Sequence, residues 1–221
     1  MRIFRSWGQC AKYGIKTDFM TRKITDDAEL IVKSFPKELE NSVISLLEKL
    51  NLETEYQTIC SESAVLRNET IIFPYRVYYK IPNKEKNHFL KSQKDPIEAD
   101  ILNCICSRHD NGFVRQEAIK NLTLSTNFWV TPYLVRIMGE YIIQILSDLN
   151  DAFDFMDREN LKQFIQQNPV FYAKTQARIS SYWFCYYRTE FPEKLNGIRV
   201  AENKRYAGFQ LLTKMDKLLK T

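Results

Sequence analysis

Hydrophobic side chains recur every three or four positions over residues 130–149, the widest apolar stripe in the chain. This spacing is typical of a helix that buries one face, so the pattern predicts one long core helix. The polar positions of this stretch fall on the opposite face of the predicted helix, and they are Arg136, Glu140, Gln144 and Asp148.

Two shorter helices are predicted just before this stripe. Asp95-Pro96 supplies a cap and a first helical residue, and apolar positions follow on one face as far as Ile105. The turn at residues 110–112 ends that helix, because it combines Asp, Asn and Gly. A second helix is then expected over residues 113–124.

Helical spacing extends to both ends of the chain. It predicts a short helix over residues 26–35, an amphipathic helix from Pro36 to Leu50, and a helix from residue 168 to about Arg188. A last helix carries Phe209, Leu212, Met215 and Leu219. Within residues 168–188, four small residues are expected to let a neighbouring helix approach closely, and they are Ala173, Ala177, Ser180 and Ser181.

Residues 71–81 follow a different pattern, in which apolar side chains alternate with a period of two. Pro74 cannot donate to a central ladder, so an extended connector or edge strand is expected, with a helix starting at Pro74 as the alternative. The polar, basic stretch 83–94 is the predicted boundary between an N-terminal helical and extended region, 1–82, and a helical region, 95–221. The two regions are expected to pack as a single globular unit.

The composition agrees with a mostly α protein. The 221 residues include only 6 Gly and 7 Pro, whereas all-β and nucleotide-binding α/β proteins use more glycine in turns and phosphate loops. The helical segments do not repeat at one fixed period. An irregular stack of helical hairpins is therefore expected, rather than a solenoid of identical repeats.

The net charge of +5 is distributed in alternating patches along the chain. Residues 1–25 and 80–94 are basic, whereas residues 148–159 are acidic. Nucleic acid favours one continuous basic face, so the alternation suits a charged protein partner at least as well. The acidic side chains expected to contact such a partner are Asp148, Asp151, Asp154 and Asp157.

An aromatic and basic cluster ends the predicted helix that begins at residue 168. Tyrosine, tryptophan and arginine are the usual anchors of protein interfaces, and they can also stack on nucleic-acid bases. A packed aromatic core is the non-functional alternative. The candidate partner-binding residues are Arg178, Tyr182, Trp183, Tyr186, Tyr187 and Arg188.

Arg108, His109, Asp110 and Arg115 are interpreted as structural residues of the turn after residue 107. Arg115 is expected to bond to Asp110 or to a neighbouring hairpin, and His109 with Asp110 is expected to cap the helix end. An acid–base role is the alternative, because histidine titrates near neutrality. No catalytic residue is assigned.

Glu140 has two interpretations. It lies one helical turn from Arg136, so a modest surface pair between the two is expected. Its position beside Gly139, in an otherwise apolar helix, also fits a buried carboxylate. A buried carboxylate facing Arg178 or Arg188 would mark a candidate site.

The five cysteines are odd in number and lack framework spacing, which predicts free thiols in a reducing cytosol. Cys104, Cys106 and His109 lack the second ligand pair of a zinc finger, so no metal and no cofactor are expected. The chain has no apolar run of signal-peptide or membrane-spanning length. A cytoplasmic protein without a membrane partner is expected.

Residues 110–122, with an Asp-Asn-Gly turn followed by Val-Arg, resemble the turn and second helix of a HEAT-type hairpin. More broadly, the blocks between residues 74 and 188 look like uncharacterised bacterial helical proteins, and they cover a little over half of the chain. The resemblance implies a HEAT-like helical stack and a bacterial origin. It implies no activity, and it does not extend to the first 70 residues.

Three functions are compatible with these patterns. The first is a non-enzymatic protein-binding function, in the form of an immunity or antitoxin-like protein that neutralises a toxin by complementary charge and burial. The second is a nucleic-acid-binding or DNA-repair function, on the plan of the HEAT-like alkyl-base glycosylases. The third is an enzyme of unknown class built around Arg108, His109 and Glu140.

Overall fold

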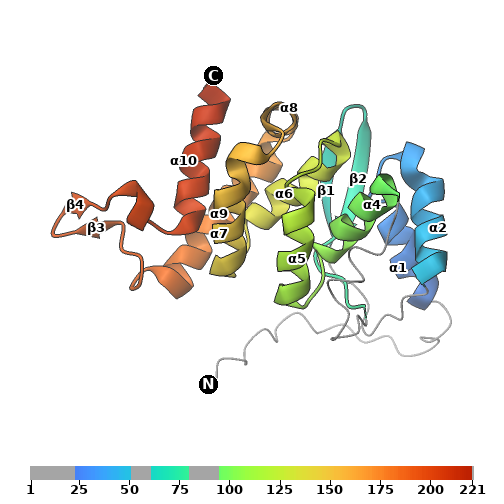
Figure 1. Cartoon of the computed structure of the whole chain (residues 1–221), viewed down its shortest axis with the longest axis horizontal. Helices are drawn as coiled ribbons and strands as arrows, with labels where there is room; N and C mark the ends of the chain where they lie inside the picture. The colour runs from blue at the N-terminus through green and yellow to red at the C-terminus, as the bar shows by residue number, and fades with distance from the viewer. Residues whose placement is uncertain (1–22, 51–60, 80–94, 221) are drawn as a thin grey trace.

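Helices make up most of the computed structural model, which describes residues 23–50, 61–79 and 95–220 (Figure 1). The mostly α class is confirmed, with two small antiparallel strand pairs in the described part of the chain. Residues 1–22 and 80–94 lie outside the described residues, and with them most of the basic segment 1–25, the basic segment 80–94 and the expected boundary at 83–94.

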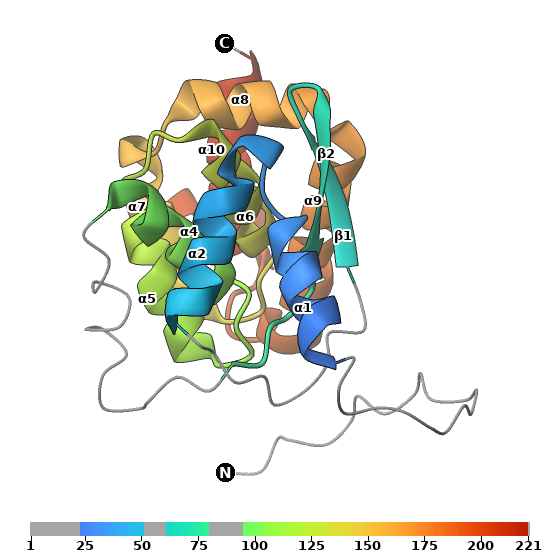
Figure 2. The ribbon, with the colours of Figure 1, turned by 90° about the vertical axis from the view of Figure 1, so that its right-hand side faces the viewer.

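The first half of the described chain consists of helices and one β-hairpin. Its elements are α1 (Lys23–Val32), a 3-10 turn (Lys37–Leu39), α2 (Glu40–Leu50), β1 (Ser61–Leu66), β2 (Glu69–Pro74), α4 (Pro96–Cys106) and α5 (Gly112–Leu122). Figure 2 shows α8 across one end of the β1–β2 hairpin, and α8 contacts β1. The hairpin also touches α9, since the rings of Phe73 and Phe171 are in edge contact.

The second half is helical except for a short hairpin at the far end of the molecule (Figure 1). Its elements are α6 (Thr131–Met138), α7 (Ile143–Ala152), α8 (Arg158–Gln167), α9 (Pro169–Tyr182), a π-helical turn (Trp183–Tyr187), β3 (Lys194–Leu195), β4 (Ile198–Arg199) and α10 (Ala207–Lys220). Short 3-10 turns lie at Phe128–Val130, Phe153–Phe155 and Glu202–Lys204.

The predicted helix start at Asp95-Pro96 is confirmed in place and mechanism, whereas α4 already ends at Cys106, before the turn at residues 110–112. The Asp95 side chain accepts a hydrogen bond from the backbone N–H of Ile97 at 2.8 Å, as an N-cap residue should. Asn111 caps α5 in the same way, by accepting from the N–H of Phe113 at 3.0 Å. Polar side chains therefore satisfy the first free N–H groups of both helices.

The extended segment is also confirmed. Ile71 and Phe73 are buried while Ile72 between them is exposed, so the period of two reflects a strand with one buried face. β2 pairs antiparallel with β1, and Pro74 lies at its last position, where its missing N–H costs least. Farther on, Val77 forms a parallel bridge to His109, which ties this segment to the turn after α4.

The single long helix predicted over residues 130–149 is wrong. α6 ends at Met138, Gly139 leaves helical geometry at φ −88° and ψ 36°, and α7 begins only at Ile143. A Cβ at position 139 would lie 3.3 Å from side-chain carbons of Arg178, so α9 packs closely against the break. The polar face predicted there is wrong for Arg136 and Glu140, which are both 2% exposed, whereas Gln144 is exposed as expected and Asp148 is half-buried.

The small residues of α9 do not pack against a neighbour, contrary to the expectation. Ala173, Ala177, Ser180 and Ser181 are all exposed. The buried face of α9 is the opposite one, formed by Phe171, Tyr172, Thr175 and Ile179. Bulky side chains supply the larger apolar area, so their burial determines which face turns inward.

Long-range contacts join the described parts into one core cluster. The Tyr133 hydroxyl on α6 donates to the carbonyl of Ser34, just after α1, at 2.7 Å. The Tyr133 ring also packs between Phe35 and Phe73. α6 therefore lies at the centre of the fold, in contact with elements from both sides of the 83–94 segment.

Candidate functional site

Five arginines and two glutamates from separate elements meet around Tyr75, at the exit of β2. We call this group the arginine cluster. Each charged member comes from a different part of the chain: β1, the segment after β2, the turn after α4, α5, α6, the α6–α7 break and α9. They are Glu62, Arg76, Arg108, Arg115, Arg136, Glu140 and Arg178.

Glu140 is held by two cations inside the protein. Its Oε2 lies 2.9 Å from Nη2 of Arg76 and 3.1 Å from Nε of Arg115, and its Oε1 accepts from the N–H of Tyr141. Burial alone would raise the pKa of Glu140. The charges of Arg76 and Arg115 outweigh burial, so the pKa of this carboxyl is lowered and the group stays ionised.

Glu62 is the second carboxylate of the cluster. Nε of Arg136 donates to its Oε2, and Nη2 of Arg178 donates to its Oε1. Glu140 is thus a buried carboxylate, as one of the two interpretations held, but neither expected pair exists. Arg136 does not pair with it on the surface, and Arg178 pairs with Glu62 instead.

Tyr75 lies among three guanidinium groups. The Cζ atoms of Arg136, Arg76 and Arg108 lie 4.9, 5.0 and 5.9 Å from the centre of its ring. Burial raises the pKa of Tyr75, but a hydrogen bond with Tyr182 and the nearby charges more than offset this. The pKa of Tyr75 is consequently below its ordinary value, which reflects the positive potential of the site.

Arg108 is one of three almost fully buried cations of the cluster, with Arg115 and Arg136. Its Nε donates to the carbonyl of Pro74 at 3.1 Å, and its Nη2 donates to the carbonyl of Tyr75. Burial, followed by repulsion from Arg136 and Arg76, lowers its pKa well below the ordinary range. Arg108 therefore holds the end of β2 in place at a considerable electrostatic cost.

Of the two partners expected for Arg115, the neighbouring segment is present, as the Arg115–Glu140 pair, and the Asp110 carboxylate is not. Arg115 donates from Nη1 to the carbonyls of His109 and Asp110, both at 2.7 Å, and not to the Asp110 carboxylate. The buried His109 ring contacts the carbonyl of Tyr79 through Nε2 and accepts from the N–H of Asn111 at Nδ1. Backbone carbonyls are the acceptors because the turn folds over the guanidinium of Arg115.

The aromatic and basic cluster of residues 178–188 divides into a packed side and an exposed side. Trp183 stacks near Phe209, and its Nε1 donates to the carbonyl of Phe191, while Tyr187 packs on Tyr206. These two side chains anchor the π-helical turn to α10. The members that face solvent are Tyr186 and Arg188, together with Phe184, over whose ring the Arg188 guanidinium lies at 4.4 Å.

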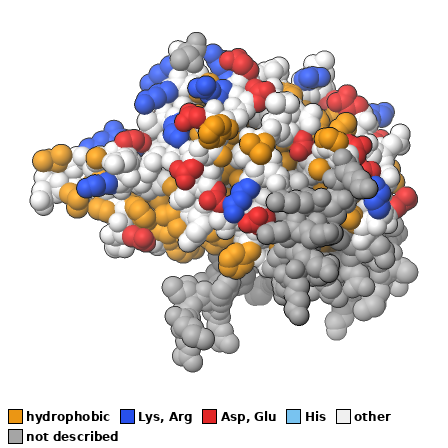
Figure 3. Space-filling view, in the orientation of Figure 1, with side chains coloured by type: hydrophobic (Ala, Val, Ile, Leu, Met, Phe, Trp, Pro, Cys, Tyr) orange, Lys and Arg blue, Asp and Glu red, His pale blue; other side chains and the backbone are white. Residues whose placement is uncertain are grey.

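Beside this turn the β3–β4 hairpin projects from the molecule (Figure 1). Leu195 and Ile198 are direct cross-strand partners, and they are 59% and 74% exposed. Asn196 and Gly197 between them have positive φ, as a two-residue hairpin turn requires. We call Phe184, Tyr186, Leu195 and Ile198 the apolar end; hydrophobic side chains gather there in Figure 3.

Sequence reasoning missed this hairpin, although Asn196-Gly197 is the dipeptide that would have revealed it. The aromatic stretch just before it favours a helix that ends at about Arg188, and hydrophobic spacing alone gives no sign of the hairpin that follows. Glu62 and Arg76 had no such signal, because their partners lie far away in the sequence.

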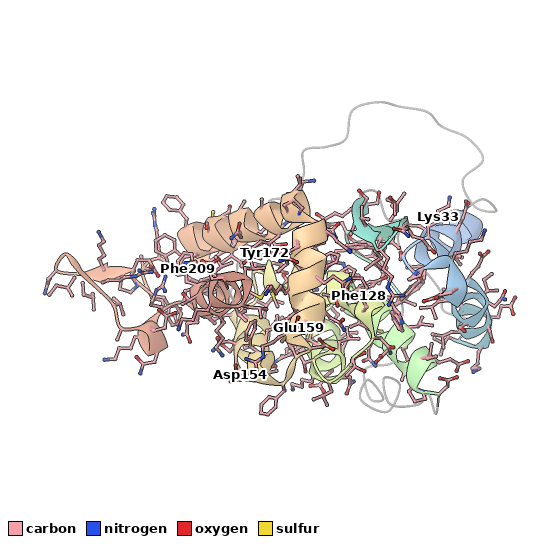
Figure 4. The ribbon with its side chains drawn as sticks, turned by 90° about the horizontal axis from the view of Figure 1, so that it is seen from above. Lys33, Phe128, Asp154, Glu159, Tyr172 and Phe209 are labelled. Carbon is pink, nitrogen blue, oxygen red and sulfur yellow. The ribbon has the colours of Figure 1, made fainter. Side chains whose placement is uncertain are left out.

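The acidic residues after residue 147 have mostly local roles. Asp148 accepts from Nε2 of Gln116 at 2.7 Å, and Asp157 caps α8 by accepting from the N–H of Asn160 at 2.9 Å. Asp154 lies 3.9 Å from Nζ of Lys214 on α10, and Asp151 is exposed. Figure 4 places Asp154 on the half of the molecule that also holds Phe209, far from Lys33.

Within the described ranges, no three His, Cys, Asp or Glu side chains are grouped so that they could hold a metal ion. Cys104 and Cys106 are buried, and burial raises the pKa of the Cys106 thiol to about 12. The helices of the described segments are all too short or too polar to cross a membrane.

Comparisons of the chain with protein-family models, with curated proteins and with solved structures returned no match. The geometry of its own residues is therefore the basis for the function proposed below.

Proposed function

We propose that the protein is a non-enzymatic binding protein that holds a protein partner against its apolar end. The observation that supports this most is the exposed pair Leu195 and Ile198 at the tip of a projecting hairpin. Exposed apolar side chains that gather beside polar ones are typical of protein interaction sites. Phe184 and Tyr186 of the π-helical turn are exposed as well.

The hairpin is built poorly for its own stability. Lys194 and Arg199 are directly opposite each other on β3 and β4, and like charges in that position are destabilising. Leu195 and Ile198 gain little by packing on one another in water. A partner with an apolar pocket rimmed by acidic groups would offset both costs, since it would bury the apolar pair and face the two cations.

A bacterial toxin neutralised in the cytoplasm is the partner we propose, which would make the chain an immunity or antitoxin-like protein. Tight neutralisation requires a few deeply buried anchors, and aromatic and aliphatic side chains on a rigid support supply them. The packing of Trp183 and Tyr187 against α10 provides that support for the neighbouring exposed residues.

The test compares the chain with an Ile198→Asp variant in co-purification from the native host, followed by titration of the recovered protein. Truncating or charging an interface anchor costs about 2 kcal/mol or more, so we expect affinity to fall by roughly 30-fold or more. Unchanged thermal stability of Ile198→Asp would show that the loss lies in binding.

Val170→Asp is the matched control, because Val170 is 69% exposed and lies at the opposite end of α9, about 20 Å of helix from the π-helical turn. It should bind like the unaltered chain. Equal binding by Ile198→Asp and the unaltered chain would contradict the proposal. So would recovery of nucleic acid in place of protein, with binding that weakens steeply as salt rises.

A further inference from the structure

The arginine cluster carries more positive charge than its own carboxylates neutralise. Arg76 has a further interaction besides its pair with Glu140, so it is left out of the count. The other four guanidinium groups meet two carboxylates, Glu62 and Glu140, which leaves an excess of two positive charges among the described residues of the cluster. Burying an unpaired ion costs several kcal/mol even after relaxation, so an excess of this size is expensive to maintain for structure alone. Well-packed apolar residues would serve the core at lower cost.

The excess coincides with hydrogen-bond donors that the described part of the protein does not use. Nη1 of Arg108 and Nη2 of Arg136 are buried and have no hydrogen-bond partner there. Both guanidinium groups lie against the ring of Tyr75. Repulsion from Arg136 is the largest charge effect on Arg108, which indicates that the two cations are close together. Water would satisfy the N–H groups but would not offset the charge.

We propose that the arginine cluster is a binding site for a phosphate-sized oxyanion, either inorganic phosphate or the phosphoryl group of a small molecule. The two negative charges and several acceptor oxygens of such an ion match an excess of two cations better than a single carboxylate does. Arginine suits this role because its planar group offers several fixed N–H donors to phosphate oxygens. The site is separate from the apolar end and does not depend on the function proposed for it.

The cluster has a solvent-facing side through which such an ion would reach it. The side chains of Arg178, Glu62 and Arg76 are 21%, 14% and 12% exposed, whereas those of Arg136 and Arg115 are 2% and 0% exposed. Exposure therefore falls from Arg178 on α9 towards the interior. The Arg178–Glu62 pair lies at the edge, and an entering oxyanion would compete with Glu62 for its guanidinium partners.

The test is thermal unfolding and isothermal titration of the full chain with sodium phosphate, with sodium chloride at matched ionic strength as the reference. Ten times the dissociation constant of phosphate should raise the melting temperature by on the order of 3 °C. Sulfate should act similarly. A sugar phosphate and a nucleoside monophosphate distinguish the two sources of the oxyanion: tighter binding of either one identifies a phosphorylated ligand, and weaker binding of both identifies the free ion.

Arg136→Lys tests the site itself, because it keeps the charge and removes the planar set of donors. We expect phosphate affinity to fall about tenfold or more, while Arg199→Lys, in the exposed hairpin, should leave it unchanged. If Arg136→Lys does not fold, Arg178→Gln at the exposed edge serves the same comparison. Equal melting temperatures in phosphate, sulfate and chloride would overturn the proposal, as would equal phosphate affinity in the cluster variant and in Arg199→Lys.

Discussion

Glu140 neutralises positive charge in the interior of the protein, because it pairs with both Arg76 and Arg115. Replacing it by Gln would remove the carboxylate that pairs with Arg76 and with the fully buried Arg115. Removing one partner of a buried pair costs about 3–5 kcal/mol, so Glu140→Gln should lower the free energy of unfolding by that amount at pH 7. Urea denaturation measures it. Glu117→Gln, which removes an exposed pair with Lys120, should change stability by less than about 1 kcal/mol.

The stability lost in Glu140→Gln should depend on pH. The pKa of Glu140 is lowered from 4.5 in the folded state, so its contribution is complete above the unfolded value and is lost as pH falls through the folded one. The difference between Glu140→Gln and the unaltered chain should therefore shrink below about pH 4.3. A difference that stays constant down to pH 3 would show that the variant acts through packing instead.

Local pattern was enough to predict some residues of the site and not others. Arg108, Arg115 and Glu140 could be singled out because each departs from its surroundings, as a turn residue or as a charge in an apolar stretch. Their partners were not predictable, since hydrogen bonds to the carbonyls of Pro74 and His109 depend on where distant backbone passes. Glu62 and Arg76 become notable only once the fold brings them together.

At the scale of elements, the period of the apolar residues predicted where helices lie better than where they end. The apolar stripe over 130–149 continues without interruption through the break between α6 and α7. The reason is that Ile142, which is not helical, and Ile143, which begins α7, are both apolar and half-buried. The break itself follows from Glu140 turning inward to its cations and from the close approach of α9 at Gly139. Neither cause is visible in hydrophobic spacing.

Another close approach, between α9 and α10, gives a prediction for Gly208. A Cβ there would lie 2.7 Å from Cε1 of Tyr206 and 2.8 Å from Cγ2 of Ile179, both of which are fully buried. Overpacking of this kind costs about 1–3 kcal/mol, which exceeds the helix propensity gained. Gly208→Ala should therefore lower the melting temperature, measured by circular dichroism. Ser181→Ala on the exposed face of α9 should not, and an equal or higher value for Gly208→Ala would refute this packing.

At the scale of the whole molecule, one amide fastens the β1–β2 hairpin to the helices. The Asn168 side chain accepts from the N–H of Val65 at 2.7 Å, and its Nδ2 lies within hydrogen-bond distance of the carbonyls of Val65 and Phe164. Asn168→Ala should lower the free energy of unfolding by about 2–3 kcal/mol, because buried backbone groups lose their partner. Urea denaturation is again the measurement.

Asn160→Ala is the control for this change. Its Nδ2 makes one exposed bond to the carbonyl of Thr126, so its loss should cost about 1 kcal/mol or less. If the two asparagine variants were equally stable, the amide of Asn168 would not be the link between hairpin and helices. Asn168 lies between α8 and α9. Nothing in the local sequence indicates that such a polar residue bonds to Val65, 103 residues away, so this link was not predictable.

The position of the arginine cluster in the fold also bears on the order in which the chain folds. Its two outermost partners, Glu62 and Arg178, are 116 residues apart in the sequence. Closing so long a loop is slow in comparison with forming single helices, and the charges remain in water until it closes. We therefore expect the cations to lose their water late in folding. Partly folded chains keep those groups hydrated, which makes early, incorrect closure of the interior unfavourable.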